Sequence, residues 1–395
     1  MTKLEELINE LCPDGVEYVP IKEITKFEQP TKYIVKSTNY RDDFNTPVLT
    51  AGQTFILGYT NETDGIYNAS KEHPVIIFDD FTGAFKWVDF PFKVKSSAMK
   101  MISANKDVTT LRYIYHVMGH LNFISSEHKR LWIGIYSAFR VPFPPLSIQS
   151  EIVHILDSFT LLTAELTAEL TARKKQYAFY RDYLLDFSNE DVTKKIPDID
   201  CSNVEYKRLG NIAIIERGKR VVRNDLSQEI GYPVYQNALK PLGYYTDKNR
   251  NANSVFVIGA GAAGEIGYSY VDYWAADDCF TFVCDDKLNQ RYLYFLLMSK
   301  QAYLKNNVRK SSIPRLPRIA LENMEIPVPP LSVQENIVKI LDRFDKLNND
   351  MSEGLPAEIE ARKKQYEYYR DTLLSFDDKA CSQIVKVERE RANTQ

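Results

Sequence analysis

The segment PPLSIQSEIVHILD at residues 144–157 decides the architecture, because it recurs as PPLSVQENIVKILD at residues 329–342. Ten of the fourteen positions are identical, at an offset of 185 residues. A second block, ARKKQYAFYRDYLLDF at 172–187, returns as ARKKQYEYYRDTLLSF at 361–376, with twelve of sixteen positions identical at an offset of 189. Two matched blocks in the same order indicate an internal duplication of the whole frame.

The sequence between the repeated blocks has diverged. Only sparse similarity joins TPVLTAGQTFILGYT at 46–60 to YPVYQNALKPLGYYT at 232–246. A plain tandem duplication with drift would erode the frame and the inserts alike. The uneven similarity therefore predicts that the frame does one symmetric task while the two inserts do related but different tasks.

Composition bounds the class of protein. The 395 residues, at roughly 150 per domain, suggest two or three domains, and 44% hydrophobic with 26% charged residues is typical of a globular chain. The 50 basic and 53 acidic residues give a net charge of −3. A nucleic-acid partner must therefore be met by local basic patches, not by bulk charge.

Cysteine and histidine spacing argues against metal sites and disulfides. The five cysteines form no CxxC pair, which favours a reducing compartment. His116 and His120 are four residues apart without an HExxH motif, so surface or core histidines are the better interpretation. The first 20 residues lack a continuous apolar core, and we expect neither a signal peptide nor a membrane span but a cytoplasmic chain.

Both repeated blocks read as long helices with apolar residues at alternating four- and three-residue spacing, which predicts a coiled-coil seam. We expect about 40 residues per helix, or about 60 Å, and pairing of the two helices. The first contains TAELTAEL at 163–170, with Leu166 and Leu170 in the seam. In the second, Gly354 and Pro356 should interrupt the helix.

The inserts read as mixed α+β domains. Strands are predicted at Val75–Phe78, Trp87–Phe92, Ser254–Ile258 and Phe280–Cys284, and helices at Leu111–Leu121 and Gln290–Leu304. The predicted organisation is an N-terminal helix at 1–17, a first insert at 18–145, a first long helix at 146–188, a linker at 189–204, a second insert at 205–330, a second long helix at 331–376 and a polar tail at 377–395.

Two motifs suggest catalysis but lack its context. Gly259–Gly264 matches GxGxxG after a strand, yet the following residues read as another strand and not as the helix that a phosphate-binding loop needs. We expect a tight turn or a close backbone approach to DNA there. Asp79 and Asp80 lack an ordered carboxylate and lysine constellation, and are interpreted as exposed turn acids. No phosphate-binding GxxxxGK[ST] loop, hydrolase elbow or adenine methyltransferase motif occurs.

Basic and amide-bearing clusters in both inserts predict contact with DNA. Lysine and arginine beside serine suit phosphate oxygens, and glutamine or asparagine can read adenine through two hydrogen bonds. Recurrence in both inserts favours this reading over solvated charge. The candidate DNA-facing residues are Lys86, Trp87, Lys95, Ser97, Arg220, Gln236, Asn237, Arg309, Lys310 and Arg315.

The PPLSxQ entry, the twice-written RKKQYxxYRDxLL block and the TAELTAEL spacer resemble the specificity subunit of type I restriction-modification systems, in particular its type IC branch. The resemblance covers nearly the whole chain. It implies an α+β fold with two mixed α/β target recognition domains separated by two long antiparallel coiled-coil helices, related by a pseudo-two-fold internal repeat. The N-terminal helix should lie beside the C-terminal one.

The resemblance also implies a function in phage defence. The subunit is itself not an enzyme, and it reads an asymmetric bipartite double-stranded DNA site. The first domain looks like those that read GAA, across a gap of about six base pairs. Two adenine methyltransferase subunits and ATP-dependent restriction subunits dock on it. S-adenosylmethionine, ATP and Mg then belong to those partners, and this chain carries no cofactor.

Two other classes of protein stay open from the residues alone. One is a cofactor-binding enzyme that uses the loop at 259–264. The other is a coiled-coil scaffold that does not read bases. Equal binding of specific and random duplexes would favour the scaffold.

Overall fold

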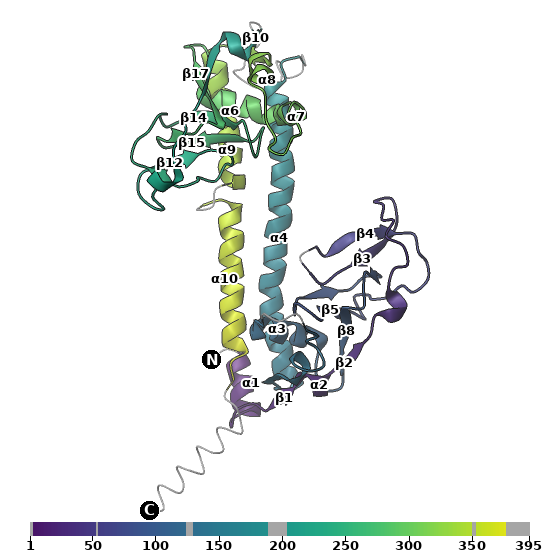
Figure 1. Cartoon of the computed structure of the whole chain (residues 1–395). Helices are drawn as coiled ribbons and strands as arrows, with labels where there is room; N and C mark the ends of the chain where they lie inside the picture. The colour runs from purple at the N-terminus through teal and green to yellow at the C-terminus, as the bar shows by residue number, and fades with distance from the viewer. Residues whose placement is uncertain (1–2, 53, 124–128, 189–203, 350–352, 377–395) are drawn as a thin grey trace, which may run out of the picture. The chain divides into compact units, whose positions relative to one another are not determined.

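The computed structural model describes residues 3–52, 54–123, 129–188, 204–349 and 353–376 (Figure 1). The chain divides into two compact units, called unit 1 (Met1–Glu165 with Glu360–Gln395) and unit 2 (Leu166–Ile359). Nearly all of the predicted linker and the whole predicted tail lie outside the described residues. The other predicted domain boundaries stay predictions.

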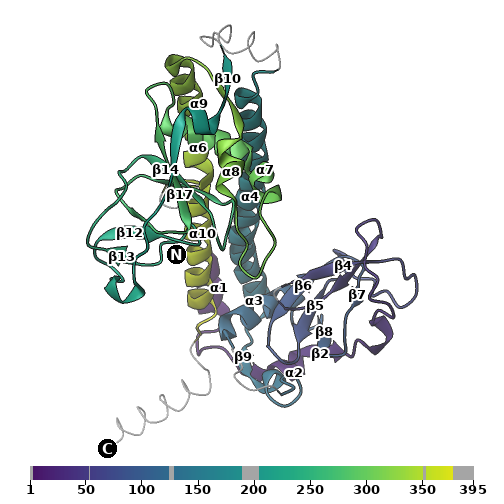
Figure 2. The same cartoon turned by 45° about the horizontal axis from the view of Figure 1, so that its top comes forward.

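Unit 1 contains a four-stranded antiparallel sheet and a smaller mixed sheet. The large sheet has the order β2-β8-β5-β6, the small sheet has the order β4-β3-β7, and β1 pairs with β9. Figure 2 shows the small sheet on the side of the large one away from α4. The strands are β1 (Tyr18–Pro20), β2 (Thr25–Glu28), β3 (Thr46–Leu49), β4 (Ile56–Thr60), β5 (Val75–Asp79), β6 (Phe85–Val88), β7 (Lys93–Val94), β8 (Met99–Ala104) and β9 (Arg140–Pro142).

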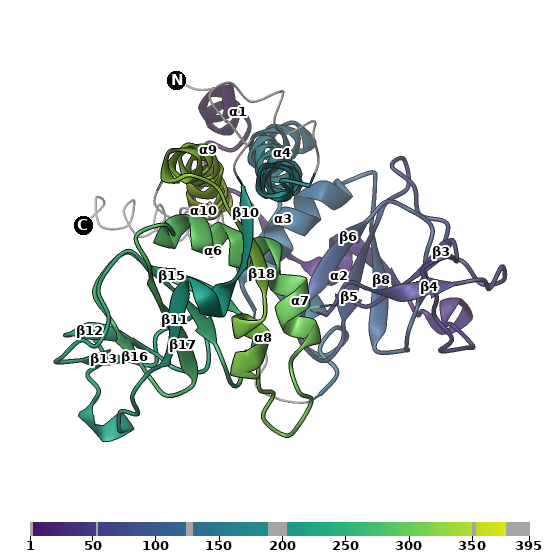
Figure 3. The ribbon, with the colours of Figure 1, turned by 90° about the horizontal axis from the view of Figure 1, so that it is seen from above.

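Unit 2 repeats this topology strand for strand. Its large sheet has the order β11-β17-β14-β15, its small sheet has the order β13-β12-β16, and β10 pairs with β18. In Figure 3 its small sheet lies on the side away from α9. The strands are β10 (Glu205–Arg208), β11 (Ala213–Arg217), β12 (Tyr232–Tyr235), β13 (Tyr244–Tyr245), β14 (Ser254–Ile258), β15 (Ile266–Ser269), β16 (Trp274–Ala275), β17 (Cys279–Cys284) and β18 (Glu325–Val328).

The predicted strands and helices of the inserts are largely confirmed. The strand expected at Trp87–Phe92 is shifted, because β6 ends at Val88. The helix expected at Gln290–Leu304 is two helices that meet at Lys300. The described helices are α1 (Lys3–Leu11), α2 (Ile21–Ile24), α3 (Leu111–Leu121), α4 (Leu146–Leu185), α6 (Gln290–Ser299), α7 (Gln301–Asn306), α8 (Arg318–Glu322), α9 (Leu331–Asn349) and α10 (Leu355–Leu373).

The first long helix forms as expected and the second is broken as expected. Helix α4 has 40 residues, whereas α9 and α10 have 19 each. Pro356 is the second residue of α10, where the missing N–H has no partner to lose. Within the described ranges, no helix is both long and apolar enough to cross a bilayer.

Each unit pairs the start of one repeat's helix with the end of the other's. In unit 1, Phe159 of α4 stacks on Tyr369 of α10 with ring centroids 5.1 Å apart. In unit 2, the equivalent rings of Phe344 and Tyr180 stack at 5.6 Å. Since the side-chain amide of Asn348 also reaches the carbonyl of Arg173 at 3.4 Å, α9 and α4 run antiparallel there.

The N-terminal helix takes the position that the resemblance implies. Leu4 of α1 is 5% exposed and shares one apolar cluster with Leu374, just after α10, and with Ile152 of α4. The predicted seam is therefore only partly a helix-to-helix contact. Ile148 and Ile152 are fully buried in the core of the insert, because the domain covers the beginning of α4.

The glutamine of PPLSxQ holds each domain to its helix. In unit 2, Gln334 is fully buried and its amide oxygen accepts from the backbone of Asn289 at 2.9 Å. Its amide nitrogen donates to the carbonyls of Lys287 at 2.7 Å and Pro329 at 2.8 Å. Gln149 makes the corresponding bonds to Val108 and Pro144 in unit 1. The motif glutamine thus closes the loop that precedes α3 or α6.

We expect Gln334→Leu to lower the free energy of unfolding by about 2–4 kcal/mol, because three backbone groups lose their buried partner. Urea unfolding followed by circular dichroism measures this. Gln228→Leu, at an exposed position, is the control and should change stability by less than about 0.5 kcal/mol. Equal stability of the two variants would contradict this role of the buried glutamine, which we call the glutamine clamp.

Candidate nucleic-acid interface

Five segments of unit 2 meet at one end of its large sheet. The backbone N–H of Gly218 donates to the carbonyl of Cys279 at 3.0 Å, and that of Lys219 to Ala275 at 2.9 Å. The N–H of Ala276 donates to the carbonyl of Tyr235 at 2.9 Å. Together with the glycine-rich loop and the arginine loop, these segments form what we call edge 2, made of residues 217–220, 235–237, 259–264, 275–278 and 309–315.

The glycine-rich loop joins the other parts of edge 2. Gly261 donates its N–H to the carbonyl of Pro314 at 3.1 Å, and Ala262 donates to the carbonyl of Asn237 at 2.9 Å. Gly261 has φ +83°, and a Cβ there would lie 2.8 Å from the Cβ of Asn237. The predicted tight turn is confirmed. Strand β15 follows it, so the helix that a dinucleotide loop requires is missing at this place.

All six candidate residues of the second insert lie on edge 2. The backbones of Arg309 and Arg315 pair with each other, with N···O distances of 2.8 and 3.3 Å. Asn237 is exposed and the preceding Gln236 is half-buried. Segments more than 70 residues apart in sequence thus bring cations and amides to one surface. These are the side-chain types that make phosphate and base contacts in protein–DNA complexes. Their individual roles stay predictions. Among these candidates the exposed cations are Arg220, Arg309, Lys310 and Arg315.

Cys279 supports edge 2 from beneath. Its thiol donates to the carbonyls of Tyr235 and Gln236, both at 3.2 Å. Burial raises the pKa of this thiol to about 12. A thiol with so high a pKa is a packing group and not a nucleophile.

The corresponding end of the large sheet in unit 1 is called edge 1 and includes residues 49–51, 80, 95–98 and 130. It is identified by equivalent hydrogen bonds: Asp80 N–H donates to Ala98 at 2.7 Å, as Gly259 does to Asp278 at 2.6 Å. Lys95 donates its N–H to Leu49 at 3.2 Å, and its side chain is exposed. Edge 1 therefore contains the candidates Lys95 and Ser97, both exposed.

The other two candidates of the first insert do not share one surface. Lys86 and Trp87 are consecutive in β6, so their side chains leave opposite faces of the sheet. The ring of Trp87 faces α3, with the guanidinium of Arg112 at 4.8 Å and the ring of Tyr115 at 5.9 Å. There it lines a pocket of about 790 Å³ with Arg112 and Asp157. The structure thus places Trp87 apart from Lys95 and Ser97.

Two lysines near edge 1 are buried, which the sequence did not indicate. Lys93 is 1% exposed and lies 3.1 Å from a carboxylate oxygen of Glu62. Lys100 is fully buried and lies 2.8 Å from Asp80. The interpretation of Asp80 as an exposed turn acid is wrong, because its side chain is 2% exposed. The burial of a charged side chain in a strand or turn depends on partners that are distant in sequence, so local sequence patterns do not predict it.

A polar network attaches each insert to its long helix. A short repeated motif marks this network in the sequence, and the sequence analysis did not identify it. RYIY at 112–115 and RYLY at 291–294 occupy the same turn of α3 and α6. The Nε of Arg112 lies 2.7 Å from a carboxylate oxygen of Asp157, and the Nε of Arg291 lies 2.7 Å from Asp342. Asp157 and Asp342 end the two copies of the block that begins PPLS.

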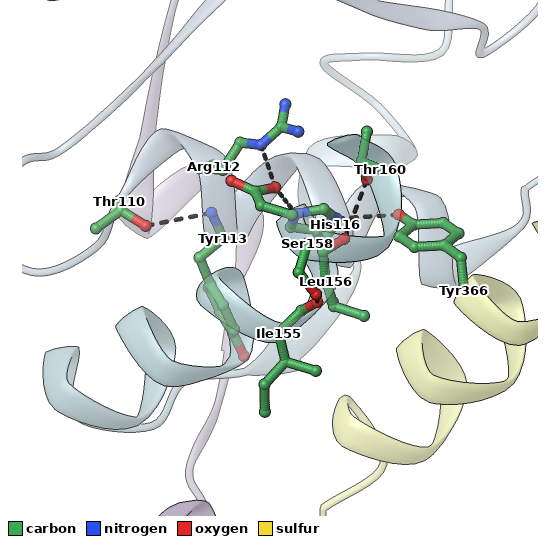
Figure 4. A network of polar contacts seen from close by, with 10 residues as sticks. Thr110, Arg112, Tyr113, His116, Ile155, Leu156, Ser158, Thr160 and Tyr366 are labelled. Carbon is green, nitrogen blue, oxygen red and sulfur yellow. Dashed lines mark hydrogen bonds and ion pairs between the residues drawn. The ribbon is translucent and has the colours of Figure 1, made fainter. Parts of the chain in front are cut away.

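The network of unit 1 includes a buried histidine (Figure 4). His116 lies 2.8 Å from Asp157 through Nε2 and 3.0 Å from the hydroxyl of Tyr366 through Nδ1. Burial lowers the pKa of His116, and this outweighs the hydrogen bond to Asp157. Burial also acts to raise the pKa of Asp157, but hydrogen bonds from His116 and Arg112 lower it overall. The imidazole is therefore neutral at pH 7.

Neither His116 nor His120, which are four residues apart, lies among side chains that could complete a metal site. His120 bonds to Asp371 at 2.9 Å, and His116 is satisfied as described. Across the part of the chain that the structure describes, no group of three or more histidine, cysteine or acidic side chains could hold a metal ion.

Comparisons with known proteins agree with a duplicated DNA-specificity architecture. The family model of the type I restriction modification DNA specificity domain matches residues 13–173 and 201–361. The chain is 42% identical over 411 residues to the specificity subunit of the Escherichia coli type I restriction enzyme EcoR124I/EcoR124II, covering 95% of this chain and 97% of that protein. It is 29% identical over 407 residues to a putative type I specificity subunit of Haemophilus influenzae, covering 95% and 98%.

Solved structures show the same fold. The S subunit of a type I restriction-modification system from M. genitalium aligns with a TM-score of 0.63 at 14% identity, over 91% of this chain and 96% of that chain. A chain from a structural study of type I R-M assembly aligns with a TM-score of 0.54 at 18% identity, over 91% and 97%.

The two matched domains and their long helices define a DNA sequence-specificity protein. The chain belongs to the family of type I restriction-modification specificity subunits. It is a non-catalytic subunit of a multisubunit restriction enzyme, and its role is to recognise DNA sequence.

The His116 network generates a pH prediction. A group whose pKa is lowered in the folded state takes up protons more readily when unfolded, so stability falls as the pH drops below the ordinary histidine value of 6.5. His116→Phe, which copies Phe295 of α6, should lose less free energy of unfolding between pH 7.5 and 5.5 than the native chain. The pKa of Asp157 lies below its ordinary 3.8, outside this window.

Thermal and urea unfolding across that pH range measure the effect. His154→Phe changes an exposed ring on α4 and should keep the native pH dependence. The explanation fails if His116→Phe and the native chain lose stability in parallel.

Proposed function

We propose that this chain reads an asymmetric, bipartite DNA site, with one half-site at edge 1 and the other at edge 2. The observation that carries the proposal is that the two edges share one backbone arrangement but present different side chains. Strand β12 is followed by Gln236 and Asn237, whereas the equivalent strand β3 is followed by Thr50 and Ala51. Different groups at equivalent places suit different base sequences.

The finer details rest on the family resemblance of the sequence. The first half-site is GAA, and the gap is about six base pairs. The chain works in the cytoplasm, where host and phage DNA meet. Catalysis belongs to partner subunits, which bring S-adenosylmethionine for adenine methylation and ATP with Mg for restriction.

Docking of two methyltransferase subunits is supported by a repeated exposed surface. Phe179 of α4 is 63% exposed and Tyr368 of α10 is 67% exposed, at the same position of the repeated block. Large exposed aromatic side chains are typical of protein interfaces. A surface present once in each unit suits a partner that binds twice.

The experiment that tests the proposal is single-molecule sequencing of methylated adenines in a host that expresses this chain with its modification subunits. We expect one motif with two different halves, of which the first is GAA, and methylation on both strands. The matched control lacks this chain and should show no such motif. A palindromic motif, or methylation without sequence preference, would contradict the proposal.

Helix α4 should act as a ruler through its TAEL segment. The boundary between the two units falls inside that segment, after Glu165, and Leu166 and Leu170 are only half-buried. Four helical residues rotate the helix end by about 40° and add about 6 Å. The rotation is close to the roughly 34° of one base-pair step, and the added length exceeds its rise of about 3.4 Å.

Insertion of a third TAEL unit after Leu170 should lengthen the gap of the methylated motif by one base pair and leave both halves unchanged. Adenine methylation sequencing of the variant measures this. Replacing Thr167–Leu170 by another four-residue helical sequence is the control and should keep the native gap. An unchanged gap after the insertion would refute the ruler.

A further inference from the structure

Arg130 occupies the place in unit 1 that Arg315 occupies in unit 2. The residue after each arginine makes the same hydrogen bond: Leu131 N–H donates to the carbonyl of Asp80, and Leu316 N–H to the carbonyl of Gly259, both at 2.8 Å. The offset of 185 residues equals that of the block that begins PPLS.

Asp80 fixes the segment that follows Arg130. Its carboxylate oxygen Oδ1 accepts from the backbone of Leu131 at 3.2 Å and of Trp132 at 2.8 Å. Trp132 is 1% exposed and anchors this segment in the core of unit 1. In unit 2 the equivalent residue is Gly259, which has no side chain. The carboxylate that binds the backbone after the arginine is therefore specific to the first domain.

Lys100 leaves Arg130 available to another anion. The Nζ of Lys100 lies 2.8 Å from Oδ2 of Asp80, and both side chains are buried. The guanidinium of Arg130 is farther from the same oxygen, at 3.9 Å, and its side chain is 58% exposed. Since the buried lysine lies closer to the aspartate, the guanidinium of Arg130 makes only a long contact with Asp80 and faces solvent at edge 1, where Lys95 is also exposed.

An exposed guanidinium on a fixed backbone segment suits the hydrogen-bond acceptors of DNA. It donates two parallel hydrogen bonds to a phosphate or to the O6 and N7 of guanine. We propose that Arg130 contacts DNA in the first recognition domain and that Asp80 is its positioning residue. This rests on the proposed function, because it assumes that edge 1 faces the first half-site.

The first experiment measures DNA binding by the complex of this chain with its modification subunits. The probe is a duplex with the motif read from methylated host DNA, compared with the same duplex scrambled in the first half-site. Arg130→Ala should weaken binding about tenfold. A uniform loss with a smaller salt slope identifies a phosphate contact, whereas tolerance of substitutions for guanine identifies a base contact.

Lys22→Ala is the matched control. Lys22 is an exposed cation of α2, which precedes β2 and so lies at the opposite end of the sheet from edge 1. It should bind like the native chain. If Arg130→Ala also binds like the native chain, the inference is overturned. If the native complex binds the intact and scrambled duplexes equally, the proposed function itself fails.

A second experiment tests Asp80 as a positioning residue. Asp80→Ala combined with Lys100→Met removes both charges, so no lone charge stays buried. This pair of substitutions should weaken DNA binding several-fold in the native background. In the Arg130→Ala background it should cause no further loss of DNA binding. Thermal unfolding of the same complexes reports whether the fold is kept.

Asp80→Asn with Lys100→Met provides the rescue. Its amide oxygen can still accept from Leu131 and Trp132, so binding should return close to that of the native complex. The positioning role is overturned if Asp80→Ala with Lys100→Met weakens DNA binding equally in the native and Arg130→Ala backgrounds. It is also overturned if the asparagine variant forms a folded complex but does not restore DNA binding.

Discussion

The contact between the start of one repeat's long helix and the end of the other's is the constraint on which each unit depends. The stacked pairs Phe159–Tyr369 and Phe344–Tyr180 make this contact with the same residues in both units. Such a pair contributes about 1 kcal/mol beyond the burial of its area. Neither copy of the repeat can therefore complete a unit alone, and unit 1 needs residues from both ends of the chain.

The polar network and the glutamine clamp turn this helix pair into a platform for a recognition domain. The arginine–aspartate pairs and the motif glutamines leave the inserts little freedom to rotate about their helices. A half-buried ion pair adds little net stability, but it defines orientation. Orientation matters here, because an edge that reads bases must meet the groove in one register.

The two edges show how one frame carries two chemistries. In unit 1 the turn after the central strand is held by the buried pair Lys100 and Asp80. In unit 2 a glycine stands at the place of Asp80, and a Cβ on Gly259 would lie 2.7 Å from the ring of Phe280. Both solutions keep the same backbone hydrogen bonds. The frame is thus maintained while the exposed groups are free to differ.

The sequence by itself determined the duplication, the 40-residue α4, the break at Gly354 and Pro356 and the α+β character of the inserts, because repeats, helical periodicity and helix breakers act locally along the chain. It also indicated the cations of edge 2. Only the tertiary structure decided that Asp80 and Lys100 are buried together. It alone also decided that the ring of Trp87 points towards α3 and not towards Lys95. Those outcomes depend on strand register and on partners far apart in the chain, which no local pattern records.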